Sequence, residues 1–133
     1  MTTVYRVEND EHVGPYATSV PGMNHMGSAH QPAPWDTGLG WINTGELSGF
    51  DSLDQLLDWF DAREDLDNLE RGGMSVVRIN VDEGLIRRGA KHLVFREEIL
   101  GSNPRDQVSW GEVRSQLDQS WYYQQLRREQ SYG

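Results

Sequence analysis

The sequence predicts an α+β domain, with a small mixed or antiparallel sheet backed by one or two helices. Two observations favour this class. Three short segments, residues 3–8, 75–81 and 91–96, are rich in β-branched and aromatic residues, which is typical of strands. Two other segments, which begin at Ser52 and Ser109, combine helix-capping residues with apolar side chains at helical spacing. We therefore expect strands and helices to pack as layers around one core.

The first predicted strand, residues 3–8, contains no strand-breaking residue. Successive side chains of a strand point to opposite faces, so Val4, Arg6 and Glu8 share one face. Tyr5 and Val7 share the other face, which we expect to be the core face. Arg6 then points into a cleft or into solvent.

The helix predicted from Ser52 has a complete start signal. Ser52 is an expected N-cap residue, and Gln55 three residues later completes a capping box. Phe50 stands where a hydrophobic staple packs near Leu56. The apolar residues that follow at helical spacing predict one buried stripe, with Trp59 at its border: Leu53, Leu56, Leu57 and Phe60.

A second, shorter helix is predicted to end at Gly72-Gly73, which is a typical C-terminal cap. The segments at residues 75–81 and 91–96 then alternate between two faces, as strands do. We expect both to join the strand at residues 3–8 in one sheet.

The last predicted helix begins with a second capping box, formed by Ser109 and Glu112. Val113, Leu117 and Trp121 are four residues apart and form a thin apolar seam. This seam can dock on the sheet or on a second subunit. A homodimer through the C-terminal helix is therefore one expectation for this chain.

Residues 10–49 form a long loop with no helical or strand period. We place it within an α+β core domain, residues 1–101, and treat residues 102–133 as a C-terminal helix and tail. The loop holds three of the four histidines, two of the five tryptophans and four of the five prolines. Loops of this length are usually functional or disordered, and disordered segments are poor in aromatic residues. We therefore expect an ordered wall of a recognition surface.

The composition restricts the class of protein. A chain of 133 residues is one ordinary domain, and its hydrophobic fraction of 36% and mean hydropathy of −0.71 predict a small core. No cysteine is present, which excludes disulfides, thiolate metal sites and cysteine nucleophiles. The N-terminus lacks the apolar run of a secretory signal, and no segment is long and apolar enough to span a bilayer. We expect a soluble, cytoplasmic protein without membrane contact.

The net charge of −9 is concentrated in one segment. Residues 51–70 contain eight acids and one base, a local charge of −7. Such a field repels nucleic acid and attracts basic protein surfaces. It is also what a solvated face of an amphipathic helix looks like, and it could imitate a phosphate ladder. We expect a basic protein partner and no direct nucleic-acid binding, with these candidate partner-binding residues: Asp54, Asp58, Asp61 and Asp65.

The sequence contains no motif of three common kinds of site. His12, His25 and His30 lack the spacing of a His-Glu-x-x-His metal site, because His25 and His30 are five residues apart. No Gly-x-Ser-x-Gly nucleophile motif occurs, and no glycine-rich phosphate loop. We therefore expect no metal and no resident cofactor.

A fourth set of residues could converge on one cleft. Arg6 can pair with a diphosphate, tryptophan can stack on a base, and a carboxylate, Glu97 or Glu98, can bind ribose hydroxyls or stabilise a positive transition state. Each of these residues also has a structural explanation, such as an ion pair between Arg6 and Glu8. The candidate catalytic residues are Arg6, Glu97 and Glu98, and the candidate ligand-binding residues are Tyr5, His12, Tyr16, His30, Trp35 and Trp41.

Several segments resemble small proteins encoded by bacteriophages and prophages of actinobacteria. These segments are residues 4–8, 14–16, 30–36, 49–60 and 92–95. More loosely, a first strand with an arginine and a late strand that ends in glutamate are similar to minimal ADP-ribosyltransferase-like domains. Arg6 and Glu97 or Glu98 match the first and last positions of that pattern, whereas no Ser-Thr-Ser stretch matches the middle one.

The phage resemblance implies an accessory protein in the host-cell cytoplasm that acts on a host factor, often one of a defence system. Because catalytic spacing is missing, we expect a non-enzymatic protein that binds a host partner with a basic surface. The alternative is an NAD-dependent ADP-ribosyltransferase-like enzyme, or a protein that sequesters a nucleotide, with Arg6 and Glu97 or Glu98 in its cleft.

Overall fold

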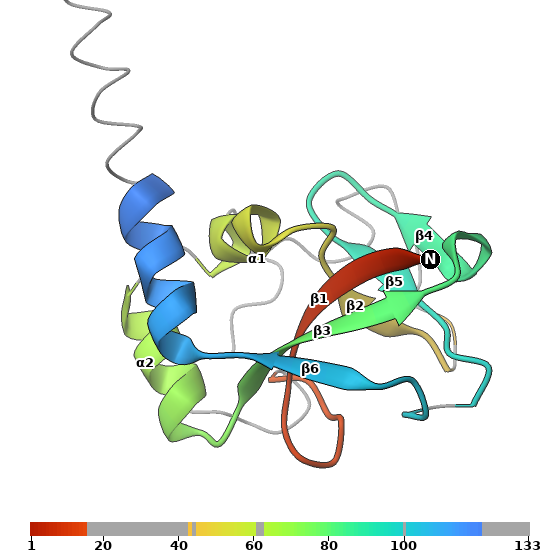
Figure 1. Cartoon of the computed structure of the whole chain (residues 1–133), viewed down its shortest axis with the longest axis horizontal. Coiled ribbons are helices and arrows are strands. Elements are labelled where there is room, and N and C mark those ends of the chain that lie inside the picture. Colours follow the sequence, from red (N-terminus) through yellow and green to blue (C-terminus); the bar gives the residue numbers. More distant parts are fainter. Residues whose placement is uncertain (16–42, 44, 61–62, 100, 121–133) are drawn as a thin grey trace, which may run out of the picture.

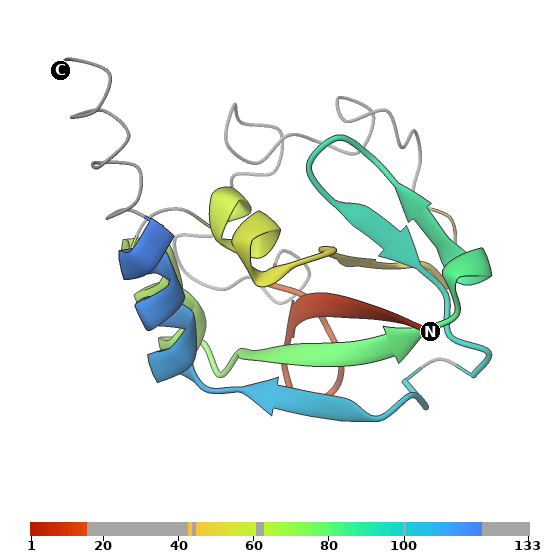
Figure 2. The same cartoon turned by 45° about the horizontal axis from the view of Figure 1, so that its top comes forward.

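The computed structural model describes residues 1–15, 43, 45–60, 63–99 and 101–120. Within them the predicted α+β class is confirmed. Two small antiparallel sheets pack against each other, and the helices gather at the end of one sheet (Figures 1 and 2). Three of the candidate ligand-binding residues in the long loop, His30, Trp35 and Trp41, lie outside the described residues, as does Tyr16.

Sheet A consists of β1 (Thr2–Glu8), β3 (Ser75–Val81) and β6 (Arg105–Val108), with β3 in the centre. β1 pairs with β3 along its whole length, from Thr2 opposite Val81 to Glu8 opposite Ser75. The first two strands are thus confirmed. β6 was not predicted, because its sequence Arg-Asp-Gln-Val has no apolar alternation and follows a proline. Its pairing with β3 makes it a strand.

Sheet B consists of β2 (Leu47–Gly49), β5 (Leu93–Phe95) and β4 (Ile86–Arg88), in that order. A short 3-10 turn, η2 (Glu83–Leu85), leads from β3 into β4. The sequence placed the strand at residues 91–96 in one sheet with β1 and β3. It lies instead in sheet B, where β5 is flanked by β2 and β4.

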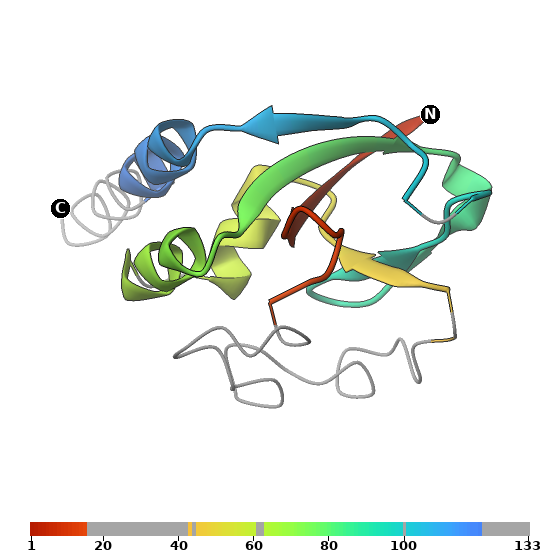
Figure 3. The same ribbon diagram turned by 90° about the horizontal axis from the view of Figure 1, so that it is seen from below.

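Two backbone hydrogen bonds join the sheets. Tyr5 N–H donates to Phe50 O at 2.8 Å, and Phe50 N–H donates to Tyr5 O at 2.7 Å. Figure 3 shows the chain after β2 leading past β1 to α1. The two sheets therefore face each other across a shared interior instead of forming one continuous layer.

Both faces of sheet A carry buried apolar residues. The inter-sheet core contains apolar residues of β1, β3 and β5: Val4, Val77, Ile79, Val81, Leu93 and Phe95. The helix-side core lies on the other face, where Val7, Val76 and Val108 pack against the helices. Val7 faces a core as predicted. The prediction that Arg6 points into a cleft or solvent is wrong, because sheet B covers that face and Arg6 is only 4% exposed.

The helices begin where their capping residues predict. α1 (Leu53–Trp59) is capped by Ser52, whose Oγ accepts from Gln55 N–H at 3.1 Å. In the helix at residues 110–120, Ser109 Oγ accepts from Glu112 N–H at 3.1 Å. That helix packs its seam on the helix-side core, with Val113 fully buried. Trp121 lies outside the described residues, and the homodimer contact stays a prediction.

α2 (Arg63–Arg71) ends in a Schellman motif at the predicted glycine pair. Met74 N–H donates to Leu69 O, and Gly73 N–H donates to Glu70 O. Gly73 adopts φ +80°, a left-handed conformation that a side chain disfavours.

Replacing Gly73 with alanine should lower the free energy of unfolding by about 1 kcal/mol, because a Cβ disfavours left-handed backbone even where space is free. Gly111→Ala is the matched control, since Gly111 lies in a helix and alanine there should raise stability by about 0.5–1 kcal/mol. Urea unfolding measures both. Equal effects of the two substitutions would contradict the assigned conformations.

Arg87 on β4 and Glu46, which precedes β2, form a bidentate pair across β5. Arg87 Nε and Nη2 each donate to a Glu46 oxygen at 2.8 Å. These hydrogen bonds lower the pKa of Glu46 from 4.5 to about 2. The pair therefore ties the two outer strands of sheet B together whenever Glu46 is ionised.

A carboxyl whose pKa is depressed in the folded state contributes stability above its unfolded pKa and loses it as pH falls through the folded one. We expect the Glu46 contribution to be complete above pH 4.5 and to disappear towards pH 2. Glu46→Gln should therefore flatten the acid limb of a plot of unfolding free energy against pH. Parallel curves for both proteins would contradict this.

Candidate functional site

Four charged side chains form a buried ionic cluster beside the inter-sheet core: Arg6, Glu8, Glu97 and Arg105. Arg6 and Glu8 come from β1, Glu97 follows β5, and Arg105 begins β6. Arg6 Nε donates to Glu8 Oε1 at 3.1 Å. Arg105 donates from Nε to Glu8 Oε2 at 3.1 Å and from Nη2 to Glu97 Oε1 at 2.5 Å. Each side chain is at most 8% exposed.

The cluster is also hydrogen bonded to the backbone. Arg6 Nη1 donates to Ser48 O at 2.8 Å, and Nη2 donates to His12 O at 3.1 Å. Glu97 Oε2 accepts from Asn103 N–H at 3.2 Å. Within the described part of the chain, no buried side-chain nitrogen or oxygen lacks a partner. The two positive and two negative charges thus balance in a dry environment.

Burial affects the pKa values of Arg6 and Glu97. It lowers the pKa of Arg6, while Glu8 opposes that effect. Burial would raise the pKa of Glu97, but hydrogen bonds from Arg105 and from the Asn103 N–H outweigh it and hold the pKa below its usual value. Glu97 is therefore ionised at neutral pH, and it neutralises Arg105.

His12 extends the cluster to the surface. Its Nδ1 lies 2.6 Å from Glu8 Oε2, and its side chain is 41% exposed. His12 has φ +65°, which is unusual for a residue other than glycine. The other described histidine, His92, is buried and stacks on Trp59, with ring centroids 4.8 Å apart.

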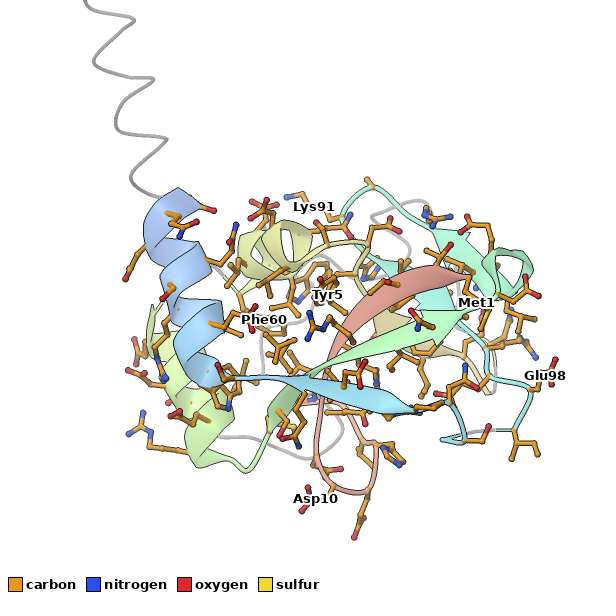
Figure 4. The ribbon with its side chains drawn as sticks, viewed as in Figure 1. Met1, Tyr5, Asp10, Phe60, Lys91 and Glu98 are labelled. Carbon is orange, nitrogen blue, oxygen red and sulfur yellow. The ribbon has the colours of Figure 1, made fainter. Side chains whose placement is uncertain are left out.

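The structure brings some predicted catalytic and ligand-binding residues together and separates others. Arg6, Glu97 and His12 belong to one network. Glu98 is exposed, and Figure 4 shows it at the outer end of the molecule. Tyr5 lies on the opposite face of β1, where it packs against the helix-side core. The predicted set therefore does not form one cleft among the described residues.

Sequence reasoning missed two members of the network. Glu8 was noted only as an ion-pair partner of Arg6, although its place two residues along the same strand puts both side chains on one face. No sequence pattern marks Arg105 as a member of the cluster, because it follows a turn in a polar stretch. Its role depends on β6, which was not predicted. Only the pairing of β6 with β3 brings Arg105 to Glu8.

The candidate partner-binding acids have different environments. Asp58 is exposed at the end of α1, and Asp54 accepts from Gln116 Nε2 at 2.8 Å and from Ser120 Oγ at 3.4 Å. Asp65 is half-buried, and Asp61 lies outside the described residues. Two acids that were not singled out, Asp67 and Glu70 of α2, bind Arg114 of the C-terminal helix.

No group of three or more histidine, cysteine or acidic side chains that could hold a metal occurs in the described parts of the chain. Across those same parts, no helix has the length and apolar character needed to cross a bilayer.

Arg105→Ala should lower the free energy of unfolding by about 3–5 kcal/mol, because it leaves two carboxylates buried without their cation. Arg114→Ala makes the same charge change in a pair that solvent reaches, so it should cost about 1 kcal/mol or less. Urea unfolding compares the two. Similar losses in both variants would show that the cluster does not hold the sheets together.

Comparison with known proteins identifies the family. A family model described as "Bacteriophage T4 Y00F protein" matches residues 1–101, well over half of the chain, and this range contains Arg6, Glu8, His12 and Glu97. No curated protein and no solved structure matches the chain. The resemblance to phage proteins is thus confirmed at the level of a family, whereas the ADP-ribosyltransferase resemblance is not shown. The chain belongs to the bacteriophage T4 Y00F protein family.

Proposed function

We propose that this phage-family protein is an accessory protein that binds a host partner with a basic surface. The binding surface is the acidic face of α1 and α2, which consists of Asp54, Asp58, Glu64, Asp67 and Glu70. The observation that carries the proposal is the distribution of charge. The chain has a net charge of −9, and the segment from residue 51 to 70 alone holds eight of its 21 acids.

Three of these acids, Asp54, Asp58 and Glu64, form no ion pair with a cation among the described residues. Asp58 and Glu64 are exposed, and no cation among those residues lies within ion-pair distance of either. Among the described residues, Asp54 accepts hydrogen bonds only from neutral groups, those of Gln116 and Ser120. Arg114 is shared between Asp67 and Glu70. A partner with several lysines or arginines would therefore find uncompensated charge here.

Such a surface mainly affects the rate of association with a partner and the choice of partner. Exposed charges of one sign raise the association rate of an oppositely charged partner, and salt screens them within about 10 Å at 0.1 M. We therefore expect the affinity to fall steeply with ionic strength.

The alternative, nucleotide binding by Arg6 and Glu97, requires existing hydrogen bonds of the ionic cluster to break. All three guanidinium nitrogens of Arg6 already donate hydrogen bonds, and both Glu97 oxygens accept them. A diphosphate or ribose would have to displace these partners from a buried site. The ADP-ribosyltransferase-like activity and its NAD requirement stay predictions, and the geometry favours the acidic face.

Reversing two unpaired charges, Asp58→Lys and Glu64→Lys, should abolish capture of a basic host protein from lysate at low salt. Neither side chain forms a hydrogen bond or ion pair with another described residue, and their opposite placements at the end of α1 and the start of α2 balance the helix-dipole effects. Thermal unfolding should therefore change little.

The control is Asp10→Lys with Asp106→Lys, two exposed acids away from α1 and α2 that give the same change in net charge. If the control loses the captured protein as fully as the test variant, overall charge and not the acidic face is responsible. If the test variant keeps it, the proposed surface is wrong.

A further inference from the structure

The solvent-facing end of the ionic cluster is a histidine with one unused nitrogen. The backbone N–H of His12 donates to Asn9 O at 3.0 Å, and its carbonyl accepts from Arg6 Nη2 at 3.1 Å. Its Nδ1 is bound to Glu8. Nε2 has no hydrogen-bond partner among the described residues, and the ring is partly exposed. Nε2 is therefore the side-chain polar atom of His12 that has no bond to a described residue.

The bond to Glu8 determines which nitrogen carries the proton. An ionised carboxylate only accepts hydrogen bonds, so Nδ1 must donate to it. In the neutral ring the lone pair then lies on Nε2. Glu8 is itself held by Arg6 and Arg105 inside the protein. A buried carboxylate that orients an imidazole in this way is the arrangement that prepares histidine for proton transfer.

Two backbone features fix the position of the ring. Among the described residues other than glycine, His12 alone has positive φ, and such strained residues are concentrated at functional sites. Gly101, with φ +78°, lies against the ring, and a Cβ at that position would be 3.0 Å from His12 Cδ2. Only glycine allows this approach without moving the imidazole.

We propose that Glu8 and His12 form a general-base site that hydrolyses a neutral or cationic ester. This activity goes beyond the proposed partner binding and uses different residues. The exposed acids Asp10 and Glu11 precede His12 directly and disfavour an anionic ligand. Proton transfer is the chemistry that an imidazole oriented by a carboxylate offers.

The reaction balances with water as the only co-reactant. The oxygen of water bonds to the ester carbonyl carbon while Nε2 of His12 takes its proton, and Glu8 keeps the Nδ1 proton in place. The bond from that carbon to the alcohol oxygen then breaks. The alcohol leaves with the proton from Nε2, so the imidazole returns to its neutral form and the products are an acid and an alcohol.

The test is hydrolysis of p-nitrophenyl acetate, a neutral ester, by the full chain. We expect a second-order rate constant above that of free imidazole, and a loss of about tenfold or more in His12→Gln. Arg6 and Arg105 still bind Glu8 in this variant, so the ion pairs of the cluster remain. His25→Ala, which also removes one imidazole, should leave the rate unchanged.

Gly101→Ala gives a second measurement. It keeps every ionisable group but displaces the His12 ring, so it should also slow hydrolysis. A wild-type rate no greater than that of imidazole would overturn the proposal, and so would full activity of His12→Gln. Because host-protein capture is measured separately, neither result bears on the acidic face.

Discussion

The four buried charges of the ionic cluster stabilise one another: Glu8 binds Arg6 and Arg105, and Arg105 also binds Glu97. Removing a charge from water costs several kcal/mol, and partners in good geometry must compensate that cost. The four residues come from β1, the segment after β5 and the start of β6, so their pairing fixes the relative positions of segments that are far apart in the chain. The cluster thus acts as a polar counterpart of the inter-sheet core.

The pairing of Arg105 with Glu8 and Glu97 is informative about the domain organisation. The family match ends at residue 101, yet Arg105 neutralises two carboxylates within the matched region. Val108 and Val113 likewise complete the helix-side core. We infer that residues 105–113 belong to the same folding unit as the matched region. The division at residue 101, which the sequence suggested, separates groups that depend on one another.

The cluster also limits which side-chain groups are available for binding or proton transfer. Because the side-chain groups of Arg6 and Glu97 already have hydrogen-bond partners inside the protein, the two proposals use other groups. One set is the acidic face, whose charge the C-terminal helix neutralises only in part through Arg114. The other is Nε2 of His12, at the point where the network reaches solvent. The proposed binding and the proposed chemistry therefore use separate groups.

The sequence by itself determined the local elements. Ser52, Ser109 and Gly73 act through hydrogen bonds and backbone angles within a few residues, so helix starts and ends could be read directly. The alternation in β1 and β3 could be read too, and so could the concentration of acids in α1 and α2. All of these depend only on neighbours along the chain.

Tertiary structure alone decided the rest. The polar β6 is a strand because β3 offers it an edge, and β5 lies in a second sheet because β2 and β4 pair with it. Arg6 is buried because sheet B covers its face, and Arg105 meets Glu8 from 97 residues away. Such long-range pairings leave no periodic pattern in the sequence, since their stability comes from shared burial and not from local geometry.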